Sequence, residues 1–142
     1  MRNSKPILYV EDDPVDVMRI KRALENLKVT NPLVSLIDGE ESLVYLKGHH
    51  NAEPCIILLD LNMSKMDGLE FIKVIKADDE LKQIPVIVLS TSDDETDIAE
   101  SFKHGAAGYM TKALDSKKFI EIIRAIDLYW TMSELPNRNQ AK

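Results

Sequence analysis

The chain has 142 residues, of which 44% are hydrophobic and 30% charged, a balance that fits one globular domain and excludes a disordered or fibrous protein. Its formal net charge of -6 provides no basic surface for a nucleic acid, and in a chain of this length we expect no separate output domain. The chain has a single cysteine, and its N-terminus lacks the apolar core of a signal peptide. Its apolar runs are far shorter than the roughly 20 residues of a membrane span. We therefore expect a cytoplasmic protein without membrane contact.

The first half of the chain alternates short apolar runs with longer amphipathic stretches. Ile7 to Val10 is apolar and stops at acidic residues, which predicts a strand followed by a loop. A helix is predicted next, because apolar residues recur at helical spacing: Val17, Ile20, Leu24 and Leu27. Leu33 to Ile37 then predicts a second strand, and Glu40 to Leu46 predicts a short helix that ends near Gly48.

The same alternation continues through the second half. Cys55 to Leu59 is apolar without interruption, which is typical of a central strand covered on both faces. A helix is predicted from Gly68 to Lys76, and a fourth strand from Ile84 to Leu89. Asp93 to Lys103 predicts a helix and Gly108 to Thr111 a short fifth strand, so strands and helices alternate throughout.

The last predicted helix starts near Asp115 and is longer than a five-strand domain needs. Its apolar residues form one stripe: Phe119, Ile122, Ile123, Ile126 and Trp130. The order of elements predicts an α/β fold, (βα)5, in which a doubly wound, five-stranded parallel sheet carries helices on both faces. We expect the domain to span residues 1–130, with an extension of the last helix and a tail over 131–142.

Polar side chains stand where four of the predicted strands end. They are Glu11, Asp12, Asp60, Ser90 and Lys112. Ligands of open parallel sheets bind outside the carboxyl ends of the strands, so we expect these side chains to converge there. Clustered carboxylates repel one another, and a hard divalent cation relieves that repulsion, which predicts a Mg²⁺ site. Together, the three carboxylates, the hydroxyl and the ammonium indicate phosphoryl transfer.

Four segments carry a family resemblance: ILYVEDDP, ILLDLNM followed by MDG, PVIVLS and GYMTK. In this order and spacing, the chain resembles a response-regulator receiver domain from about Pro6 to Tyr129. The resemblance implies a flavodoxin-like receiver fold and a single-domain response regulator of a two-component system, which accepts phosphate from a sensor histidine kinase and signals through phosphorylation-dependent protein contacts. It also implies that the chain is not an enzyme, and promotes only its own aspartyl phosphorylation and dephosphorylation.

The resemblance assigns the reacting carboxylate and the metal ligands. Asp60 corresponds to the phosphoacceptor and to a metal ligand, and Asp12 to a direct metal ligand. Glu11 would act on the metal through water, and the backbone carbonyl of Asn62 would complete the protein's contribution. The implied metal is Mg²⁺.

The resemblance also assigns groups beside the phosphoryl position. Ser90 would donate a hydrogen bond to one phosphoryl oxygen and Lys112 would pair with another, while Tyr109 corresponds to the aromatic that moves inward on activation. Thr91 competes with Ser90 for the hydroxyl role, and the spacing from Pro85 favours Ser90. The family usually has proline where this chain has Ala113, which leaves the isomer of the preceding peptide bond open.

Two other functions stay open. A Mg²⁺-dependent aspartyl phosphohydrolase of the haloacid-dehalogenase type also places an Asp after a buried strand, but it needs a second Asp two residues later, where this chain has Asn62. A pseudo-receiver would bind partners without phosphorylation, and the presence of every reacting group argues against it.

The end of the last helix adds expectations about partners. The aromatic segment ending in Tyr129 and Trp130 resembles the receivers that serve phytochromes, which implies a phytochrome-type kinase and a downstream protein target. Because both aromatics extend past the expected end of the domain, we expect a symmetric homodimer through this helix and its extension. In the alternative, Trp130 folds back onto its own domain, held by Leu135 and Pro136.

Overall fold

Five strands and five helices alternate in the computed structural model, which describes residues 5–48, 53–63 and 65–132. The strands are β1 (Ile7–Val10), β2 (Leu33–Leu36), β3 (Ile56–Leu59), β4 (Val86–Ser90) and β5 (Gly108–Thr111). The helices are α1 (Pro14–Asn26), α2 (Gly39–Gly48), α3 (Gly68–Ala77), α4 (Glu95–Lys103) and α5 (Ser116–Met132). Every predicted element is confirmed, with small shifts at the boundaries.

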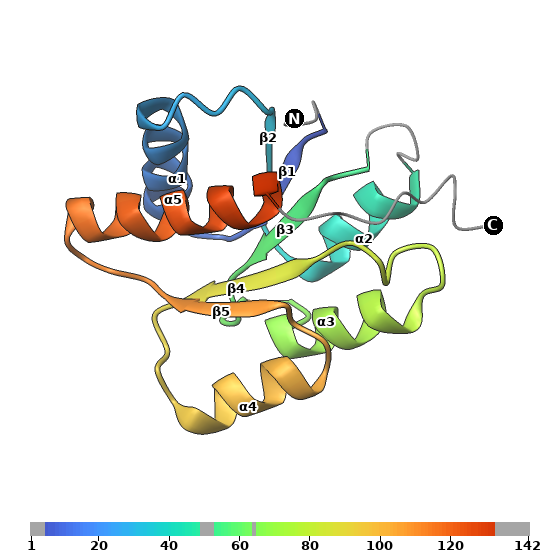
Figure 1. The fold of residues 1–142 in the computed structure, drawn as a ribbon. Helices are drawn as coiled ribbons and strands as arrows, with labels where there is room; N and C mark the ends of the chain where they lie inside the picture. Colours follow the sequence, from blue (N-terminus) through green and yellow to red (C-terminus); the bar gives the residue numbers. More distant parts are fainter. Residues whose placement is uncertain (1–4, 49–52, 64, 133–142) are drawn as a thin grey trace.

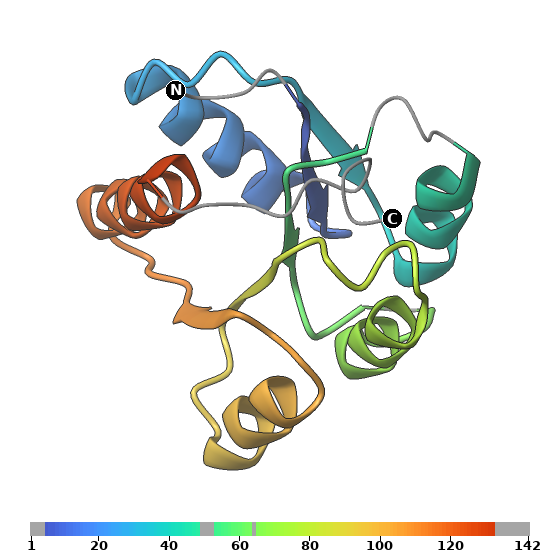
Figure 2. The same ribbon diagram turned by 45° about the vertical axis from the view of Figure 1, so that its right-hand side comes forward.

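All five strands are parallel and lie in the order β2-β1-β3-β4-β5 (Figure 1). Helices α1 and α5 cover one face of the sheet, while α2, α3 and α4 lie on the other (Figure 2). This is the predicted flavodoxin-like arrangement. Its strand order reverses beside β1, and ligands of such sheets bind at the carboxyl ends of the strands near that reversal.

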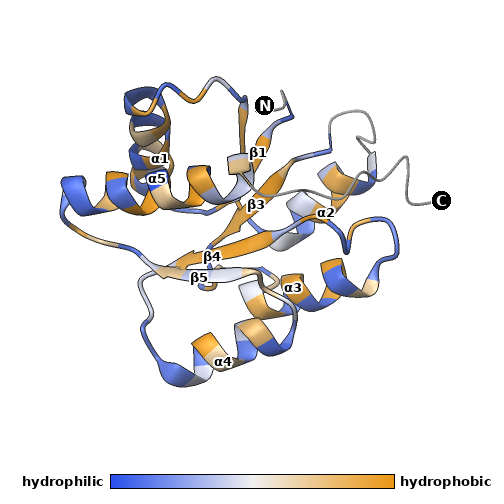
Figure 3. Cartoon of the chain, viewed as in Figure 1, coloured by the Kyte–Doolittle hydropathy of each residue, from blue (hydrophilic) through white to orange (hydrophobic). Residues whose placement is uncertain are grey.

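Each face of the sheet has its own apolar core. Tyr9 and Leu58 pack towards α1 and α5, whereas their chain neighbours Leu8 and Leu59 pack towards α2 and α3. The central strands are therefore apolar along their whole length, while the helices alternate between apolar and polar residues (Figure 3). Within the described ranges, no helix combines the length and apolar character that a bilayer span requires.

The end of α5 departs from one prediction. Trp130 is only 3% exposed and shares a buried cluster with Ile7 and Cys55, at the amino ends of β1 and β3. The expectation that Trp130 projects past the domain is therefore wrong, because the sheet still provides a surface beneath the last turns of the helix. Tyr129, by contrast, is 44% exposed. Leu135 and Pro136, which would hold Trp130 in the alternative, lie outside the described residues.

Candidate functional site: an acidic cluster beside a buried lysine

Backbone hydrogen bonds hold the carboxyl ends of the strands in register. The N–H of Asp60 donates to the carbonyl of Val10 at 3.1 Å, and the N–H of Lys112 donates to the carbonyl of Ser90 at 2.7 Å. These bonds continue the sheet one residue past β3 and β5. The side chains of Asp60 and Lys112 consequently emerge at the same edge as Glu11, which directly follows β1.

The start of α1 leaves the acidic loop free to face this edge. Asp13 caps the helix, since its side chain accepts a hydrogen bond from the N–H of Val15 at 2.9 Å, and Pro14 occupies the first helical position. Glu11 and Asp12 therefore remain in the loop between β1 and α1. The N–H of Asp13 also donates to Glu11 Oε2 at 3.2 Å, which orients that carboxylate.

Three of the predicted carboxylates form one cluster. Oxygens of Glu11, Asp12 and Asp60 lie within 4.8 Å of one another, with Glu11 and Asp60 buried and Asp12 exposed. Burial raises the pKa of Asp60 to about 7, with a further increase from Glu11, against the opposing effects of Lys112 and a backbone hydrogen bond from Asn62. Crowded carboxylate oxygens, of which that of Asp60 resists ionisation, fit a hard divalent cation such as Mg²⁺, with the exposed Asp12 on the side open to solvent.

Lys112 lies beside the cluster, as predicted, and its side chain is 4% exposed. Its Nζ hydrogen-bonds to Glu11 Oε1, lies 2.8 Å from Asp16 Oδ2 and 3.9 Å from Asp60 Oδ1. Burial lowers the pKa of the Lys112 ammonium, but the three carboxylates raise it by more, so the net shift is upward. The group is therefore a buried positive charge aimed at the acidic cluster.

The sequence analysis missed three members of this polar network. Asp16 contacts Lys112, the Tyr9 hydroxyl donates to Glu11 Oε1 at 3.1 Å, and Arg19 Nη1 lies 3.6 Å from Asp16 Oδ1. Their positions carry weak signals. Tyr9 precedes Glu11 by two residues and so shares its face of the strand, while Asp16 lies in the first turn of α1. Burial and the neighbouring carboxylates raise the pKa of Tyr9 far above its usual value.

Ser90 and Tyr109 lie at the other side of the site. Ser90 is fully buried, and its Oγ accepts a hydrogen bond from the N–H of Ser92 at 3.2 Å, whereas Thr91 is exposed. The Tyr109 hydroxyl donates to the carbonyl of Ser92 at 2.8 Å. Ser92, two residues beyond β4, thus connects both side chains, and it was not among the predicted residues.

The structure bears on two further details of the predicted site, the role of Asn62 and the peptide bond that follows Lys112. Asn62 hydrogen-bonds to Asp60 through its backbone, and coordination of a metal by its carbonyl stays a prediction. The bond between Lys112 and Ala113 is trans, as are all peptide bonds in the described residues. The isomer that the sequence left open is therefore assigned.

Comparisons with known proteins agree with this geometry. The family model for the response regulator receiver domain matches residues 7–124. Rcp1, a response regulator of Synechocystis sp. (strain ATCC 27184 / PCC 6803 / Kazusa), is 35% identical over 130 residues, or 89% of this chain and 88% of Rcp1. FilR2 of Methanothrix harundinacea, a probable methanogenesis regulatory protein, is 37% identical over 136 residues, or 92% of this chain and 88% of FilR2.

Solved structures give the same result. The crystal structure of RcpA, a phosphorylated cyanobacterial phytochrome response regulator, has a TM-score of 0.88 at 38% identity and covers 95% of this chain and all 100% of RcpA. Mn²⁺-bound Rcp1 has a TM-score of 0.84 at 33% identity, covering 94% of this chain and 99% of Rcp1. With the sheet order and the strand-end cluster, the match over residues 7–124 shows that the chain belongs to the response regulator receiver domain family.

Proposed function

We propose that Asp60 accepts a phosphoryl group from the phosphohistidine of a sensor histidine kinase, and that the phosphorylated chain signals through changed protein contacts. One observation carries this proposal. The Asp60 carboxylate is buried between two other carboxylates, within 4.8 Å, and the Lys112 ammonium at 3.9 Å. A nucleophile with a cation site on one side and a fixed positive charge on the other suits the transfer of an anionic group.

The proposed step moves one phosphoryl group between two side chains. An oxygen of Asp60 forms a bond to phosphorus as the bond from phosphorus to the donor imidazole breaks, and the imidazole leaves with the electron pair. Lys112 pairs with a phosphoryl oxygen, and Ser90 donates its hydroxyl to another. On this proposal the chain promotes only its own phosphorylation and dephosphorylation, so it is not an enzyme with a separate substrate.

A divalent cation completes the proposed site. Asp60, Asp12 and the Asn62 carbonyl would hold Mg²⁺, with Glu11 acting through water, and the cation would supply charge neutralisation for the transferred group. The Mn²⁺-bound structure of the relative Rcp1 supports a divalent site here. We expect Asp12→Ala to abolish Mg²⁺ binding in titration calorimetry while the fold survives, since Asp12 is exposed. Unchanged Mg²⁺ affinity in this variant would contradict the assignment.

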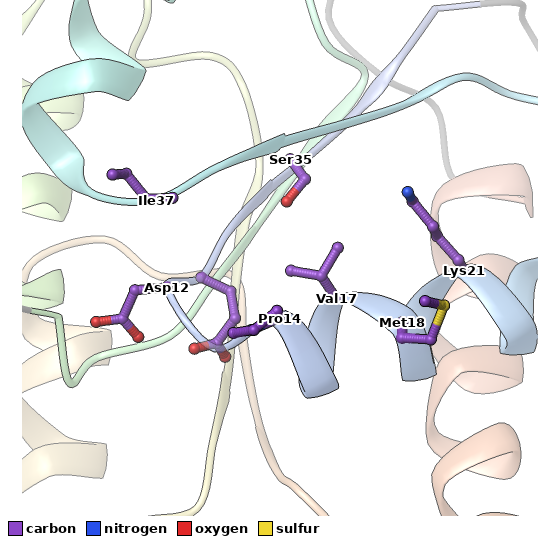
Figure 4. A pocket seen from close by; sticks show the side chains of 8 residues that line it. Asp12, Pro14, Val17, Met18, Lys21, Ser35 and Ile37 are labelled. Carbon is purple, nitrogen blue, oxygen red and sulfur yellow. The ribbon is translucent and has the colours of Figure 1, made fainter.

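Exposed apolar side chains around the site support a protein as phosphodonor. Val15 and Met18 on α1 are 64% and 50% exposed, and Leu114 after β5 is 95% exposed. Met18 also lines a pocket of about 320 Å³ between α1 and β2, with Asp12 at one end and Lys21 at the other (Figure 4). Exposed apolar side chains that gather beside a reaction centre often mark a protein docking surface.

A phosphorylation assay tests the central proposal. Metal-free protein is incubated with acetyl phosphate, with and without Mg²⁺, and its intact mass is measured. We expect one added phosphoryl group in wild type only with Mg²⁺, none in Asp60→Asn, and wild-type behaviour in Asp67→Asn, a carboxylate that caps α3 nearby. Equal incorporation in wild type and Asp60→Asn would exclude Asp60 as the acceptor, and no incorporation in either would favour the pseudo-receiver.

The donor is a finer part of the proposal. Similarity to RcpA, a phytochrome response regulator, supports a phytochrome-type histidine kinase, although FilR2 is equally similar in sequence. Measuring phosphotransfer from each purified histidine kinase of the source organism identifies the donor, because the cognate kinase transfers phosphate fastest. Preference for a kinase without a phytochrome photosensor would reject this part and leave the chemistry at Asp60 intact.

We also propose a homodimer through α5, now without Trp130 in the contact. Leu128, Tyr129 and Met132 are exposed at the end of α5 by 50%, 44% and 80%, and a two-fold contact is the commonest way to cover such a group. Light scattering should give a dimer for wild type and a monomer for the Leu128→Ser/Tyr129→Ser variant. A monomeric wild type, with and without beryllofluoride, would reject the dimer.

A further inference from the structure

A residue of helix α1 contacts the ammonium group of Lys112, which lies 96 positions later in the chain. Asp16 Oδ2 lies 2.8 Å from Lys112 Nζ, and the two side chains are only 15% and 4% exposed. A surface pair between flexible side chains contributes little to structure, but a pair shielded from water has a defined geometry. Asp16 belongs to α1 and lies outside the acidic loop that holds Glu11 and Asp12.

The same helix also holds the chain just after Lys112. The Arg19 guanidinium hydrogen-bonds to the carbonyl of Ala113, lies over the Phe119 ring at 4.0 Å from its centre, and comes within 3.6 Å of Asp16. One helical turn of α1 therefore contacts both the ammonium of Lys112 and the backbone beside it. Such contacts at two points restrict both the position and the direction of the ammonium.

The geometry around Nζ shows what this restriction achieves. A lysine ammonium has three N–H donors. Glu11 and Asp16 each accept one of them, and Asp60 lies at 3.9 Å, beyond hydrogen-bond distance. The third N–H is therefore left for a group that enters between Lys112 and Asp60, as a phosphoryl group on Asp60 does.

We propose that Asp16 is a positioning residue, which holds the Lys112 ammonium so that its remaining N–H points to the phosphoryl group as it reaches Asp60. The proposal rests on the phosphoacceptor role of Asp60 argued above. Asp16 touches neither Asp60 nor the transferred group, so it acts only through Lys112. On this proposal, the role requires an Asp16 oxygen that accepts a hydrogen bond from Lys112. The role does not require the negative charge of Asp16.

Two variants separate the hydrogen bond from the charge. Asp16→Asn and Asp16→Ala both remove the negative charge, but only Asn keeps an oxygen that Lys112 can contact. The distance of 3.6 Å from Arg19 to the other Asp16 oxygen is too long for a hydrogen bond, so the Asn amide nitrogen is tolerated there. We expect phosphorylation by acetyl phosphate at saturating Mg²⁺ to be about tenfold slower in Asp16→Ala than in Asp16→Asn.

A second measurement needs neither metal nor phosphate. In the metal-free protein, the buried Lys112 ammonium should give its own hydrogen–nitrogen correlation signal in NMR, because its protons exchange slowly with water. The signal is assigned by its absence in Lys112→Met. We expect it to persist in Asp16→Asn and to broaden beyond detection in Asp16→Ala. Near-ultraviolet circular dichroism of the buried Trp130 verifies that each variant is folded.

The outcomes separate this proposal from the one on which it rests. Glu70→Ala, which removes an exposed acidic residue from the first turn of α3, should change neither measurement. Equal phosphorylation rates in Asp16→Asn and Asp16→Ala, or an unchanged ammonium signal in Asp16→Ala, would overturn the role of Asp16. If wild type takes up no phosphate, the phosphoacceptor function fails, and the ammonium signal still decides whether Asp16 orders Lys112.

Discussion

Tyr109 lies in β5 and Lys112 directly follows that strand, but the surroundings of the two residues differ. The head of Lys112 is held by carboxylates of Glu11 and Asp16, which lie 101 and 96 positions away in the chain. Tyr109 is partly buried, and its hydroxyl makes one hydrogen bond, to the carbonyl of Ser92 only 17 positions earlier. One side of the site is therefore joined by charges between distant elements, and the other by a neutral contact to the preceding loop.

The helices beside these residues differ in the same way. Helix α1, which contacts Lys112, buries Ile20, Ala23 and Leu24 against the sheet, whereas α4 buries only Ser101. The contacts that begin α4 are local, with Ser92 Oγ donating to Asp97 Oδ2 at 2.7 Å. Elements with little buried surface open at lower free energy. We therefore expect phosphorylation to rearrange the α4 side and to leave the α1 side in place.

The largest effect should follow from removing the charge on the α1 side. Lys112→Met leaves the buried carboxylates of Glu11 and Asp60 without their positive partner, so we expect the metal-free protein to lose about 3 kcal/mol of unfolding free energy. Urea unfolding with a chelator measures this, and Mg²⁺ should restore part of the loss. Lys103→Met, which removes a lysine from a surface pair with Glu100, is the control and should change stability little.

The second prediction concerns the contact between α1 and the chain after β5. Arg19→Ala removes the hydrogen bond to the Ala113 carbonyl and the contact with the Phe119 ring, so we expect a loss of about 1–2 kcal/mol. The matched control is Arg124→Ala, since Arg124 pairs with Glu121 on the exposed surface of α5. If both variants lose the same stability in urea unfolding, Arg19 does not hold the two elements together.

The third prediction uses Asp60, which lies between the two sides. Burial raises its folded-state pKa to about 7 from the ordinary value of 3.8, so the metal-free native state binds a proton more tightly than the unfolded chain does. The stability that this proton contributes is present below pH 3.8 and is lost as the pH rises through about 7.

Asp60→Asn removes this pH dependence. With a chelator present, we expect the variant to gain on the order of 1 kcal/mol over wild type between pH 5 and pH 8. Thermal or urea unfolding at several pH values measures the difference. Saturating Mg²⁺ should reduce it, because a cation favours the ionised carboxylate. A difference that does not change with pH would contradict a raised pKa at Asp60.

The smallest effect is expected on the α4 side. Tyr109→Phe removes one hydrogen bond, to the Ser92 carbonyl, and keeps the ring, so we expect a loss of less than about 1 kcal/mol and an unchanged rate of phosphorylation by acetyl phosphate. Tyr129→Phe, which removes an exposed hydroxyl on α5 and keeps the ring that the proposed dimer contact uses, is the control. If Tyr109→Phe lost as much unfolding free energy as Arg19→Ala, the α4 side of the site would be as stable as the α1 side.

Most of the site was predictable because of where parallel strands end. Glu11, Asp60 and Ser90 each stand at the end of an apolar run, and in a parallel sheet these ends meet at one edge whatever the details of packing. Lys112 follows the same rule, although in isolation it resembles a surface lysine. The start of α1 was also predictable from the sequence, because Asp13 followed by Pro14 is a typical beginning of a helix.

The contacts of Asp16, Arg19 and Trp130 were decided only in the tertiary structure. A polar residue in the first turn of a helix has the same local pattern whether it faces solvent or a lysine 96 positions later, because periodicity assigns a face and not the element opposite to it. Trp130 looked exposed for the same reason, since the sequence does not show how far the sheet extends beneath α5. The sequence thus determined the strands, the helices and the edge where chemistry is possible. The packing of α1 and α5 determined which side chains surround Lys112, because those contacts depend on distances between elements that lie far apart in the chain.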